Sequence, residues 1–490
     1  CGMPLLVTIE DQTVIAALHT GGRDDATCYA SPIFKQSLIK AVNQLDSSVL
    51  LGINSEGTIR IHKGKQIREI TGKCPIIYED CPGISVIGSI NEYATIRPKS
   101  RLMESPVVND VEKLVGISPV ADNGKMKYLP PQMIAKMIDG KYIAPYNNWI
   151  KKVGVMKRDL DPKVMSMVAV SLAAYLTKSL KKKGVVDLAP YSLAVAQNGY
   201  PHNFYIRAIK NGTSGGFLLP GKKSLYNYPV SLDFKEDAVM PNYDVKEQVL
   251  EILDSYQRGK MSHTIVGAQL KDEPRSYDKA TSGKTRVFAM SSYDMILVNR
   301  MYLMPFYALM CEHRDLFCTK VGINMHSPEA NELYQNLSNF SNNIMEGDYG
   351  GYDTSMPVGI GMIANTVVYQ VLEKLGYNEF SLNIVKGILA DNLYPTIAME
   401  GNLFVAPGFQ PSGKYATAED NSLRGLILLY YAYVVMCTKG GEGSEYNLTT
   451  KFAVGDFFKY FLPVTYGDDM LNSVKDEIAE FFNNITYANF

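Results

Sequence analysis

The sequence predicts an α+β fold, and two observations support this prediction. From residue 342 to residue 475 the pattern is strand, helix, hairpin, helix and hairpin in succession, an order typical of α+β proteins. The 490 residues are 46 % apolar and 20 % charged, a composition typical of globular chains. A chain of this length is expected to form roughly two to four domains or subdomains.

The first expected elements are strands. Apolar and polar residues alternate over 5–9 and 14–18, on either side of a turn. Ser31 and Pro32 then favour a helix start, with serine as the cap and proline in the first turn. The apolar face of this helix would run through Phe34, Leu38, Val42 and Leu45. The glycines, prolines and short strands of 46–100 indicate a junction between units.

Long helices are expected in the rest of the chain. Asp161 and Pro162 begin one that ends in three lysines, 181–183, before Gly184. These lysines lie where they offset the helix dipole, and RNA binding by them is the less favoured alternative. Three further helices are expected at 357–375, 379–392 and 413–436. A hairpin is expected at 396–405, before the last of these helices.

The composition excludes several classes of protein. The net charge is −1, with 49 basic and 50 acidic residues, so any nucleic-acid surface must be a local patch. Seven scattered cysteines favour free thiols over a disulfide framework, and Cys311, His313 and Cys318 lack a zinc-finger spacing. The longest apolar run, Gly425 to Cys437, has 13 residues and is too short to span a bilayer. The first residues carry no signal-peptide pattern.

Adjacent carboxylates, Asp468 and Asp469, follow Tyr466 and Gly467 in a segment that predicts a tight hairpin. Two carboxylates ~4 Å apart repel by roughly 4 kcal/mol at an effective dielectric constant of about 20. A fold that gathers several of them needs a cation, and oxygen ligands favour Mg²⁺ or Mn²⁺. Two such ions ~3.5–4 Å apart are the machinery of nucleotidyl transfer. For these two residues alone, a solvated turn is the alternative.

Asp348 and Asp353 supply two more carboxylates upstream. Residues 345–348 are expected to end a strand, and the glycines at 350–351 to form a turn before the 357–375 helix. Asp348 would then lie at a strand terminus, with Asp353 returning above it. An ordinary polar loop is the alternative.

Five cations lie within sixteen residues: Lys271, Arg275, Lys279, Lys284 and Arg286. Cations aimed at a triphosphate neutralise both the bound nucleotide and the departing pyrophosphate, and arginine suits bidentate phosphate contact. A solvated hairpin is the alternative, because Asp272, Glu273 and Asp278 lie in the same run.

Small polar residues follow. Thr417 and Asn421 are four residues apart and would share a helical face, just after the flexible loop at Ser412 and Gly413. Their hydroxyl and amide groups are suited to reading a ribose by hydrogen bonds. Ordinary helix capping by Ser412 is the alternative.

In this order, Lys-Asp-Glu-Pro-Arg with Gly-Lys-Thr-Arg, Asp-x4-Asp, Ser-Gly-x3-Thr-x3-Asn-Ser and Tyr-Gly-Asp-Asp resemble motifs F, A, B and C of picornavirus-like viral RNA-dependent RNA polymerases. The resemblance covers at least residues 260–475. It implies the right-hand polymerase fold, with a junction and the start of the polymerase at 51–115, fingers at 116–340 and palm at 341–490. The thumb would be missing, because the chain stops at Phe490, soon after Asp469.

The resemblance also implies roles for the candidate residues. Asp348 and Asp468, assisted by Asp469, would bind two Mg²⁺ or Mn²⁺ ions for attack of a primer 3′-hydroxyl on the α-phosphorus. The nucleotide channel would be lined by Lys271, Arg275, Lys279, Lys284 and Arg286. Ribose recognition would fall to Asp353, Ser412, Gly413, Thr417 and Asn421.

The implied partners are an RNA template and primer, nucleoside triphosphates, a protein primer and other viral replication proteins. The implied location is the host cytoplasm, at membrane-associated replication complexes. An inserted loop at 439–443 and an inserted hairpin at 447–460 would depart from the family pattern.

The amino-terminal residues carry a second resemblance. Cys1-Gly2-Met3-Pro4, followed by His19, Gly21 and Gly22, is similar to the C-terminal end of a picornavirus-like, chymotrypsin-fold cysteine protease. It implies a β-rich protease remnant at 1–50, with Cys1 as nucleophile and His19 in the substrate pocket. The chain would then be a fragment of a polyprotein. A chance Cys-Gly pair is the alternative.

Two other functions remain open on the sequence. A reverse transcriptase is the nearest enzymatic rival, since Tyr-x-Asp-Asp occurs there too. Gly467, Asp353 and Asn421 favour synthesis from ribonucleotides instead. The third hypothesis is a catalytically incomplete segment of a polyprotein.

Overall fold

The computed structural model describes residues 81–88 and 100–490, except 122, 139 and 218, together with the backbone of several strands between residues 4 and 90. The chain divides into two compact units, Cys1–Arg68 and Glu69–Phe490. In the first unit β1 (Pro4–Ile9), β2 (Gln12–Gly22) and β3 (Cys28–Pro32) form an antiparallel sheet, and β4 (Ile59–His62) pairs with β5 (Lys65–Ile67).

The two expected amino-terminal strands are confirmed, but the expected helix start is wrong. Ser31 pairs with Leu18, and Pro32 with Ala17, in the ladder between β2 and β3. Pairing in a sheet overrides the local capping signal, and β3 is an edge strand, where proline is tolerated. The remainder of the expected helix lies outside the described residues.

A six-stranded sheet joins distant parts of the second unit. Its order is β15 (Val287–Met290), β13 (Ile265–Leu270), β17 (Thr396–Met399), β18 (Asn402–Val405), β7 (Ser85–Ile90) and β6 (Ile70–Thr71). The expected hairpin at 396–405 is confirmed as β17 and β18, which turn at Glu400 and Gly401, both with positive φ. Strands from the predicted fingers and palm ranges therefore share one sheet.

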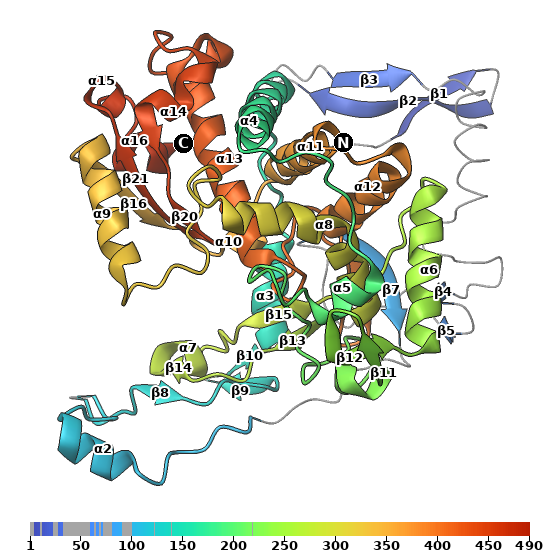
Figure 1. Cartoon of the computed structure of the whole chain (residues 1–490). Helices are drawn as coiled ribbons and strands as arrows, with labels where there is room; N and C mark the ends of the chain where they lie inside the picture. The colour runs from blue at the N-terminus through green and yellow to red at the C-terminus, as the bar shows by residue number, and fades with distance from the viewer. Residues whose placement is uncertain are drawn as a thin grey trace. The chain divides into compact units, whose positions relative to one another are not determined.

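A second, four-stranded sheet lies beside α13 and α9 in Figure 1. Its strands are β16 (Asn343–Asp348), β21 (Asp469–Val474), β19 (Phe461–Leu462) and β20 (Thr465–Tyr466), with β21 pairing to the other three. The expected strand before Asp348 and the expected hairpin at Gly467 are both confirmed.

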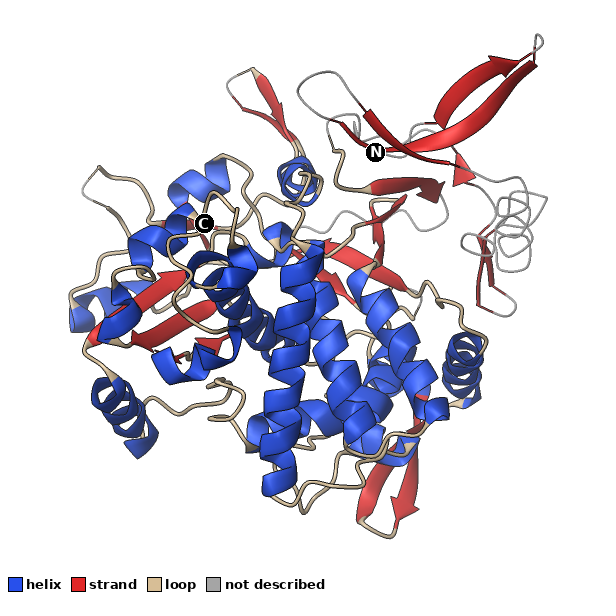
Figure 2. Ribbon diagram, turned by 90° about the horizontal axis from the view of Figure 1, so that it is seen from above, coloured by secondary structure: helices blue, strands red, loops and turns tan. Residues whose placement is uncertain are grey.

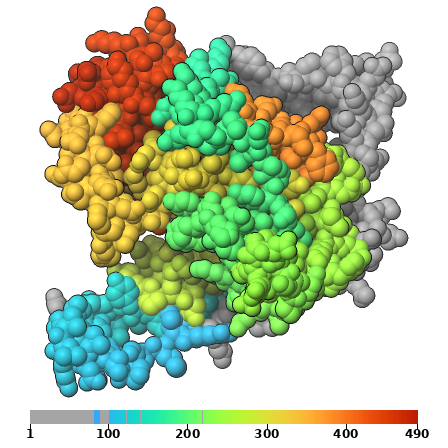
Figure 3. Space-filling view, viewed as in Figure 1, coloured from blue at the N-terminus to red at the C-terminus, as the bar shows by residue number. Residues whose placement is uncertain are grey.

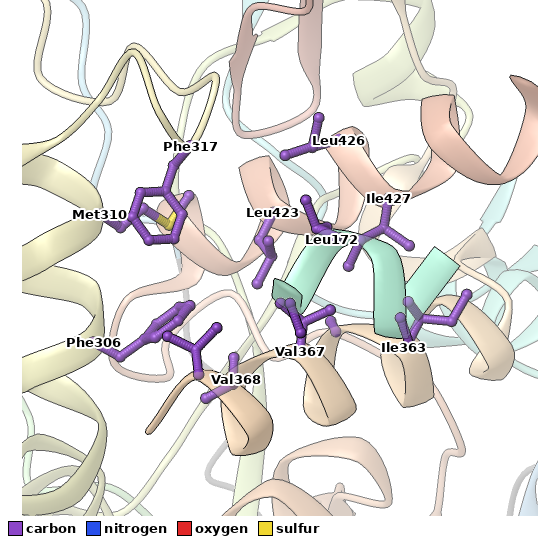
Figure 4. Close-up of a cluster of buried hydrophobic side chains, with 14 of the residues drawn as sticks. Leu172, Phe306, Met310, Phe317, Ile363, Val367, Val368, Leu423, Leu426 and Ile427 are labelled. Carbon is purple, nitrogen blue, oxygen red and sulfur yellow. The ribbon is translucent and has the colours of Figure 1, made fainter. Parts of the chain in front are cut away.

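The helices that contribute to the core of the described residues include five long ones, and Figure 2 shows a central group of helices running side by side. They are α4 (Pro162–Lys182), α8 (Tyr293–Glu312), α11 (Val358–Lys374), α12 (Glu379–Leu393) and α13 (Thr417–Cys437). Asp161 caps α4 as expected, accepting bonds from two backbone amides of its first turn. In Figure 4 side chains of α4, α8, α11 and α13 meet, among them Leu172, Phe306, Val367 and Leu423.

The apolar run from Gly425 to Cys437 is buried within α13, apart from half-buried Leu428. No helix in the described part of the chain combines the length and apolar character that a membrane span needs. The described cysteines 311, 318 and 437 are free thiols, as expected.

The expected hairpin at 447–460 is wrong. A 3-10 turn, η5 (Val454–Asp456), leads into the short helix α14 (Phe457–Tyr460). Phe457 is fully buried, stacking on Tyr430 with ring centroids 4.4 Å apart and on Phe461 at 5.2 Å. A helical turn places this aromatic residue in the core, and aromatic burial decides the local structure.

The other elements are shorter or peripheral. In Figure 3 the molecular outline is indented between α9 (yellow) and the blue-to-cyan segment that begins near residue 100. The remaining helices are α2 (Val108–Val115), α3 (Pro145–Val153), α5 (Leu193–Asn198), α6 (Tyr243–Gln257), α7 (Tyr277–Thr281), α9 (Pro328–Phe340), α10 (Tyr352–Ser355), α15 (Asp476–Ala479), α16 (Asn484–Asn489), η3 (Lys223–Tyr226) and η4 (Lys439–Gly441). The remaining strands are β8 (Tyr128–Leu129), β9 (Lys136–Ile138), β10 (Lys141–Ile143), β11 (Asn227–Leu232), β12 (Lys235–Pro241) and β14 (Arg275–Ser276).

Candidate active site

Three of the predicted carboxylates lie at one end of the four-stranded sheet. β16 and β21 pair antiparallel, and Asp348 lies directly opposite Asp469. Residues in such a pair project from the same face, with Cα atoms about 4.5–5.5 Å apart. Asp468 lies in the two-residue turn between β20 and β21, where Gly467 has a φ of +63°. All three aspartates are exposed, so the site is open to a ligand.

The donor set suits a divalent cation. Burial raises the pKa of Asp469, and the charges of Asp468 and Asp348 raise it further. A bound Mg²⁺ or Mn²⁺ ion relieves such repulsion, and every donor here is an oxygen. Within the described ranges, no three His, Cys, Asp or Glu side chains already converge as a metal site. The carboxylates therefore share one edge of the sheet, and a metal would have to draw their oxygens together.

Asp353 and Asn421, the predicted ribose-reading pair, are in direct contact. Asp353 lies in α10, and its Oδ1 accepts a hydrogen bond of 3.0 Å from Asn421 Nδ2. Tyr352 OH donates to the main-chain oxygen of Asn421 at 2.8 Å. Burial raises the pKa of Asp353, the bond from Asn421 opposes this change, and the charge of Asp468 adds to it. The pair is therefore electrostatically coupled to the carboxylate site.

Ser422 fastens α13 to the hairpin that carries Asp468, a role that the sequence did not reveal. The backbone N–H of Gly467 donates to Ser422 Oγ at 2.9 Å, and Thr465 Oγ1 donates to the main-chain oxygen of Ser422 at 3.2 Å. Its neighbour Asn421 was assigned a function, but nothing in the spacing alone points from residue 422 to residue 467. The contact fixes the turn against the helix.

Gly413 places the predicted ribose loop against the six-stranded sheet. Its backbone N–H donates to Ala289 O at 2.8 Å, and it forms a parallel bridge with Met290. A Cβ on Gly413 would lie 2.8 Å from the same oxygen, so this close approach requires glycine. Ser412, beside it, is exposed.

Thr417 holds the loop from within. Its Oγ1 donates to the main-chain oxygens of Pro411 and Lys414, at 3.2 and 3.1 Å. Helix α13 begins after Ala416 with no side-chain cap, so capping by Ser412 is not observed. The hydroxyl of Thr417 is thus engaged by the loop itself.

Glu273 lies among the predicted phosphate-binding cations. Its carboxylate is 2.7 Å from Lys271 Nζ, 3.4 Å from Arg286 Nη1 and 3.6 Å from Arg275 Nη1. Lys279 and Lys284 are exposed and form no ion pair with another described residue. The run is therefore a charged surface whose cations are partly balanced by one carboxylate.

Two candidate segments adjoin strand β15. They are the segment 271–286 with its five cations, here called the cation run, and the loop at Ser412 and Gly413, here called the ribose loop. Arg286 immediately precedes β15, and the last two residues of β15 contact Gly413. In Figure 1 the chain runs from β14 and α7, which carry Arg275 and Lys279, into the β15 segment. Motifs far apart in the sequence are thus connected through the six-stranded sheet.

The two amino-terminal candidates belong to the first unit. Cys1 lies outside the described residues. His19 belongs to β2, where its backbone is opposite Ala30 of β3. The cysteine-protease assignment stays a prediction.

Comparison with known families decides the classification. The protein-family model described as viral RNA-dependent RNA polymerase matches residues 178–488, which is well over half of the chain. The chain belongs to this family. The match includes Asp348, Asp468, Asp469 and the whole cation run, so every polymerase candidate residue lies within the RNA-dependent RNA polymerase region.

Relatives of this polymerase-family chain are long viral polyproteins. The replicase polyprotein of Acute bee paralysis virus (strain Rothamsted) is 25 % identical over 502 residues, covering 99 % of the chain and 25 % of that polyprotein. The replicase polyprotein of Cricket paralysis virus is 22 % identical over 372 residues, covering 72 % of the chain and 20 % of that polyprotein. The chain thus spans about a quarter or less of the length of these curated relatives.

A solved structure supports the fold. The Sicinivirus 3Dpol RNA dependent RNA polymerase has a TM-score of 0.60 and 16 % identity, covering 81 % of the chain and 72 % of the solved chain. At this identity the likeness concerns the fold alone, and that fold is the mixed helix-and-strand polymerase fold.

Proposed function

We propose that the chain synthesises RNA on an RNA template as part of a viral replicase polyprotein. The observation that carries the proposal is the register of β16 and β21, which places Asp348 opposite Asp469 and beside the turn of Asp468. Two carboxylates from distant segments, meeting at an exposed edge, are the donor set that two Mg²⁺ or Mn²⁺ ions require.

In this proposal the chain's residues bind and orient the nucleotide. Lys271, Arg275, Lys279, Lys284 and Arg286 attract the triphosphate. The 2′-hydroxyl of the ribose faces Asp353, Asn421 and the loop at Ser412 and Gly413. Asp348, Asp468 and Asp469 would hold the two ions, which would supply activation of the primer 3′-hydroxyl and neutralisation of the departing pyrophosphate.

The proposal extends to the rest of the chain by the same resemblance. Cys1 and His19 would be the nucleophile and a pocket residue of a cysteine protease. A protein primer, further replication proteins and a membrane-associated complex in the host cytoplasm would accompany the polymerase.

Templated incorporation on a primed RNA tests the proposal, in this chain and in one extended at its carboxyl end. We expect ATP to be incorporated in preference to dATP, because Asp353 and Asn421 lie at the ribose-reading positions. Asp468→Ala should abolish incorporation while circular dichroism shows the fold retained. Preference for dATP, or activity retained by Asp468→Ala, would contradict the proposal.

A further inference from the structure

Behind the ribose loop lies a buried cluster of charges that the proposed reaction does not use. At its centre is Asp420 of α13, which is 4 % exposed. Its Oδ2 accepts hydrogen bonds from Gln410 Nε2 at 2.7 Å, Lys414 Nζ at 2.7 Å and Arg424 Nε at 3.0 Å. Tyr307 OH of α8 donates to its Oδ1 at 3.1 Å. One carboxylate thus has four partners from three segments.

Two of these partners lie on either side of Ser412 and Gly413. Gln410 lies just before Pro411, and Lys414 lies just after Gly413. Asp420 therefore binds the chain on both sides of Ser412 and Gly413. A carboxylate that grips both ends of a short segment limits the backbone conformations open to that segment.

Burial strengthens the interaction between Asp420 and Lys414. The side chain of Lys414 is 4 % exposed and that of Asp420 is 6 % exposed. Burial alone would raise the pKa of Asp420, but Arg424 and Lys414 hold it well below its usual range. If the loop moved and withdrew Lys414, a buried carboxylate would lose a charged partner, which is strongly unfavourable. The loop also contains Ala416 at a φ of +57°, a conformation that its surroundings must impose.

The same two segments hold Asp353. The backbone N–H of Gln410 donates to the main-chain oxygen of Asp353 at 3.0 Å, and Asn421, next to Asp420, donates to its carboxylate. The loop and the carboxylate of Asp353 are therefore held by the same neighbouring residues of the two segments.

We propose that Asp420 is a positioning residue, which holds the 411–416 loop through Gln410 and Lys414 so that Ser412 and Gly413 face the nucleotide sugar. Its role in sugar recognition rests on the proposed function, whereas the clamp on the loop does not. The competing explanation is a purely structural ion pair, in which the partner on the helix, Arg424, matters as much as the partners on the loop.

Variants of the partners separate these explanations better than replacement of Asp420, which would leave two buried cations facing each other. Lys414→Met removes one loop anchor and leaves the Asp420–Arg424 pair intact. Gln410→Leu removes the other anchor. Arg424→Met is the matched control on the helix side. Lys223→Met removes a buried lysine outside the Asp420 cluster, whose Nζ donates to Thr213 Oγ1 and to the main-chain oxygen of Ser214.

Two measurements are made on each variant of the full chain. Amide hydrogen exchange reports the freedom of residues 411–417. Equilibrium titration with ATP and with dATP, in the presence of Mg²⁺, reports sugar preference. For Lys414→Met and Gln410→Leu we expect exchange in the loop to be at least about tenfold faster and the preference for ATP to fall by about threefold or more. Arg424→Met and Lys223→Met should change neither the exchange rate of the loop nor the preference for ATP.

The outcomes are distinguishable. If hydrogen exchange in the loop were unchanged in Lys414→Met and Gln410→Leu, Asp420 would not hold the loop. The same would follow if Arg424→Met accelerated exchange in the loop as much as these two variants do. A loosened loop with an unchanged ATP preference would overturn the positioning role. If the unaltered chain shows no preference for ATP over dATP, ribose recognition itself fails, and the exchange data still decide whether Asp420 holds the loop.

Discussion

At the scale of single residues, the geometry of the site depends on small groups beside the carboxylates. The residue types and their spacing predicted that these aspartates would lie close together, and Asp348 at the end of β16 does lie opposite Asp469 at the start of β21. Ser422 and Asp420 were not predicted, and Glu273 entered only as part of the solvated-hairpin alternative. The bonds from Gly467 to Ser422 and from Tyr307 to Asp420 join segments far apart in the chain, and local sequence patterns carry no information about such contacts. The i, i+4 spacing of Asp420 and Arg424 was the one local signal available.

Ser422→Ala tests the fastening of the catalytic turn. Loss of the 2.9 Å bond leaves the N–H of Gly467 without its partner, so we expect a loss of about 1–3 kcal/mol in the free energy of unfolding. Activity or Mn²⁺ affinity should fall as well. Urea denaturation and Mn²⁺ titration measure the two effects.

Ser255→Ala provides the control for this prediction. The hydroxyl of Ser255 donates only to a carbonyl of its own helix, Glu251 O, at 2.9 Å. We expect a change within about 0.5 kcal/mol and no effect on Mn²⁺. Equal effects of the two substitutions would contradict a specific role for Ser422.

Asp420 gives a prediction for pH. Its folded-state pKa is depressed, so its stabilising contribution is complete above the unfolded-state pKa of about 3.9 and is lost as the pH falls below it. The free energy of unfolding should therefore decline on acidification below about pH 4. The double variant Asp420→Asn/Lys414→Met, which lacks both charges, should show a shallower decline. Identical acid profiles would refute this assignment.

At the scale of elements, the sequence predicted the long helices and hairpins well and the short connections poorly. α4, α11, α12, α13 and the β17–β18 hairpin lie where caps, apolar periodicity and turn residues indicate. The failures at Ser31 and at 447–460 arise where tertiary partners, a strand in one case and aromatic rings in the other, outweigh local preference.

Close helix packing predicts the effect of Gly387→Ala. Alanine favours a helix over glycine by about 1 kcal/mol, but a Cβ at this position of α12 would lie 2.1 Å from Cδ1 of Tyr256 in α6. We expect the overlap to prevail, with a net destabilisation of about 1–3 kcal/mol in thermal or urea unfolding. Gly455→Ala, whose Cβ would meet no atom within 4 Å, should be nearly neutral. A stabilised Gly387→Ala would show that the helices separate at little cost.

At the scale of the whole molecule, one sheet connects the cation run, the ribose loop and the hairpin at 396–405, while another brings the aspartates together. With a near-zero net charge, the proposed nucleotide binding must depend on these local arrangements and not on a general attraction to phosphate. The proposed function therefore depends on the register between distant strands, which the strand pairing of the structure makes explicit.

Binding of Mn²⁺, followed by electron paramagnetic resonance of the free ion, tests the central claim most directly. The unaltered chain should bind Mn²⁺, and Asp348→Asn and Asp468→Asn should each weaken binding by at least about tenfold, since each removes a charged oxygen ligand. Glu480→Gln, which neutralises an exposed carboxylate elsewhere, should bind as the unaltered chain does. Undiminished Mn²⁺ affinity in both aspartate variants would contradict a shared metal site at the ends of β16 and β21.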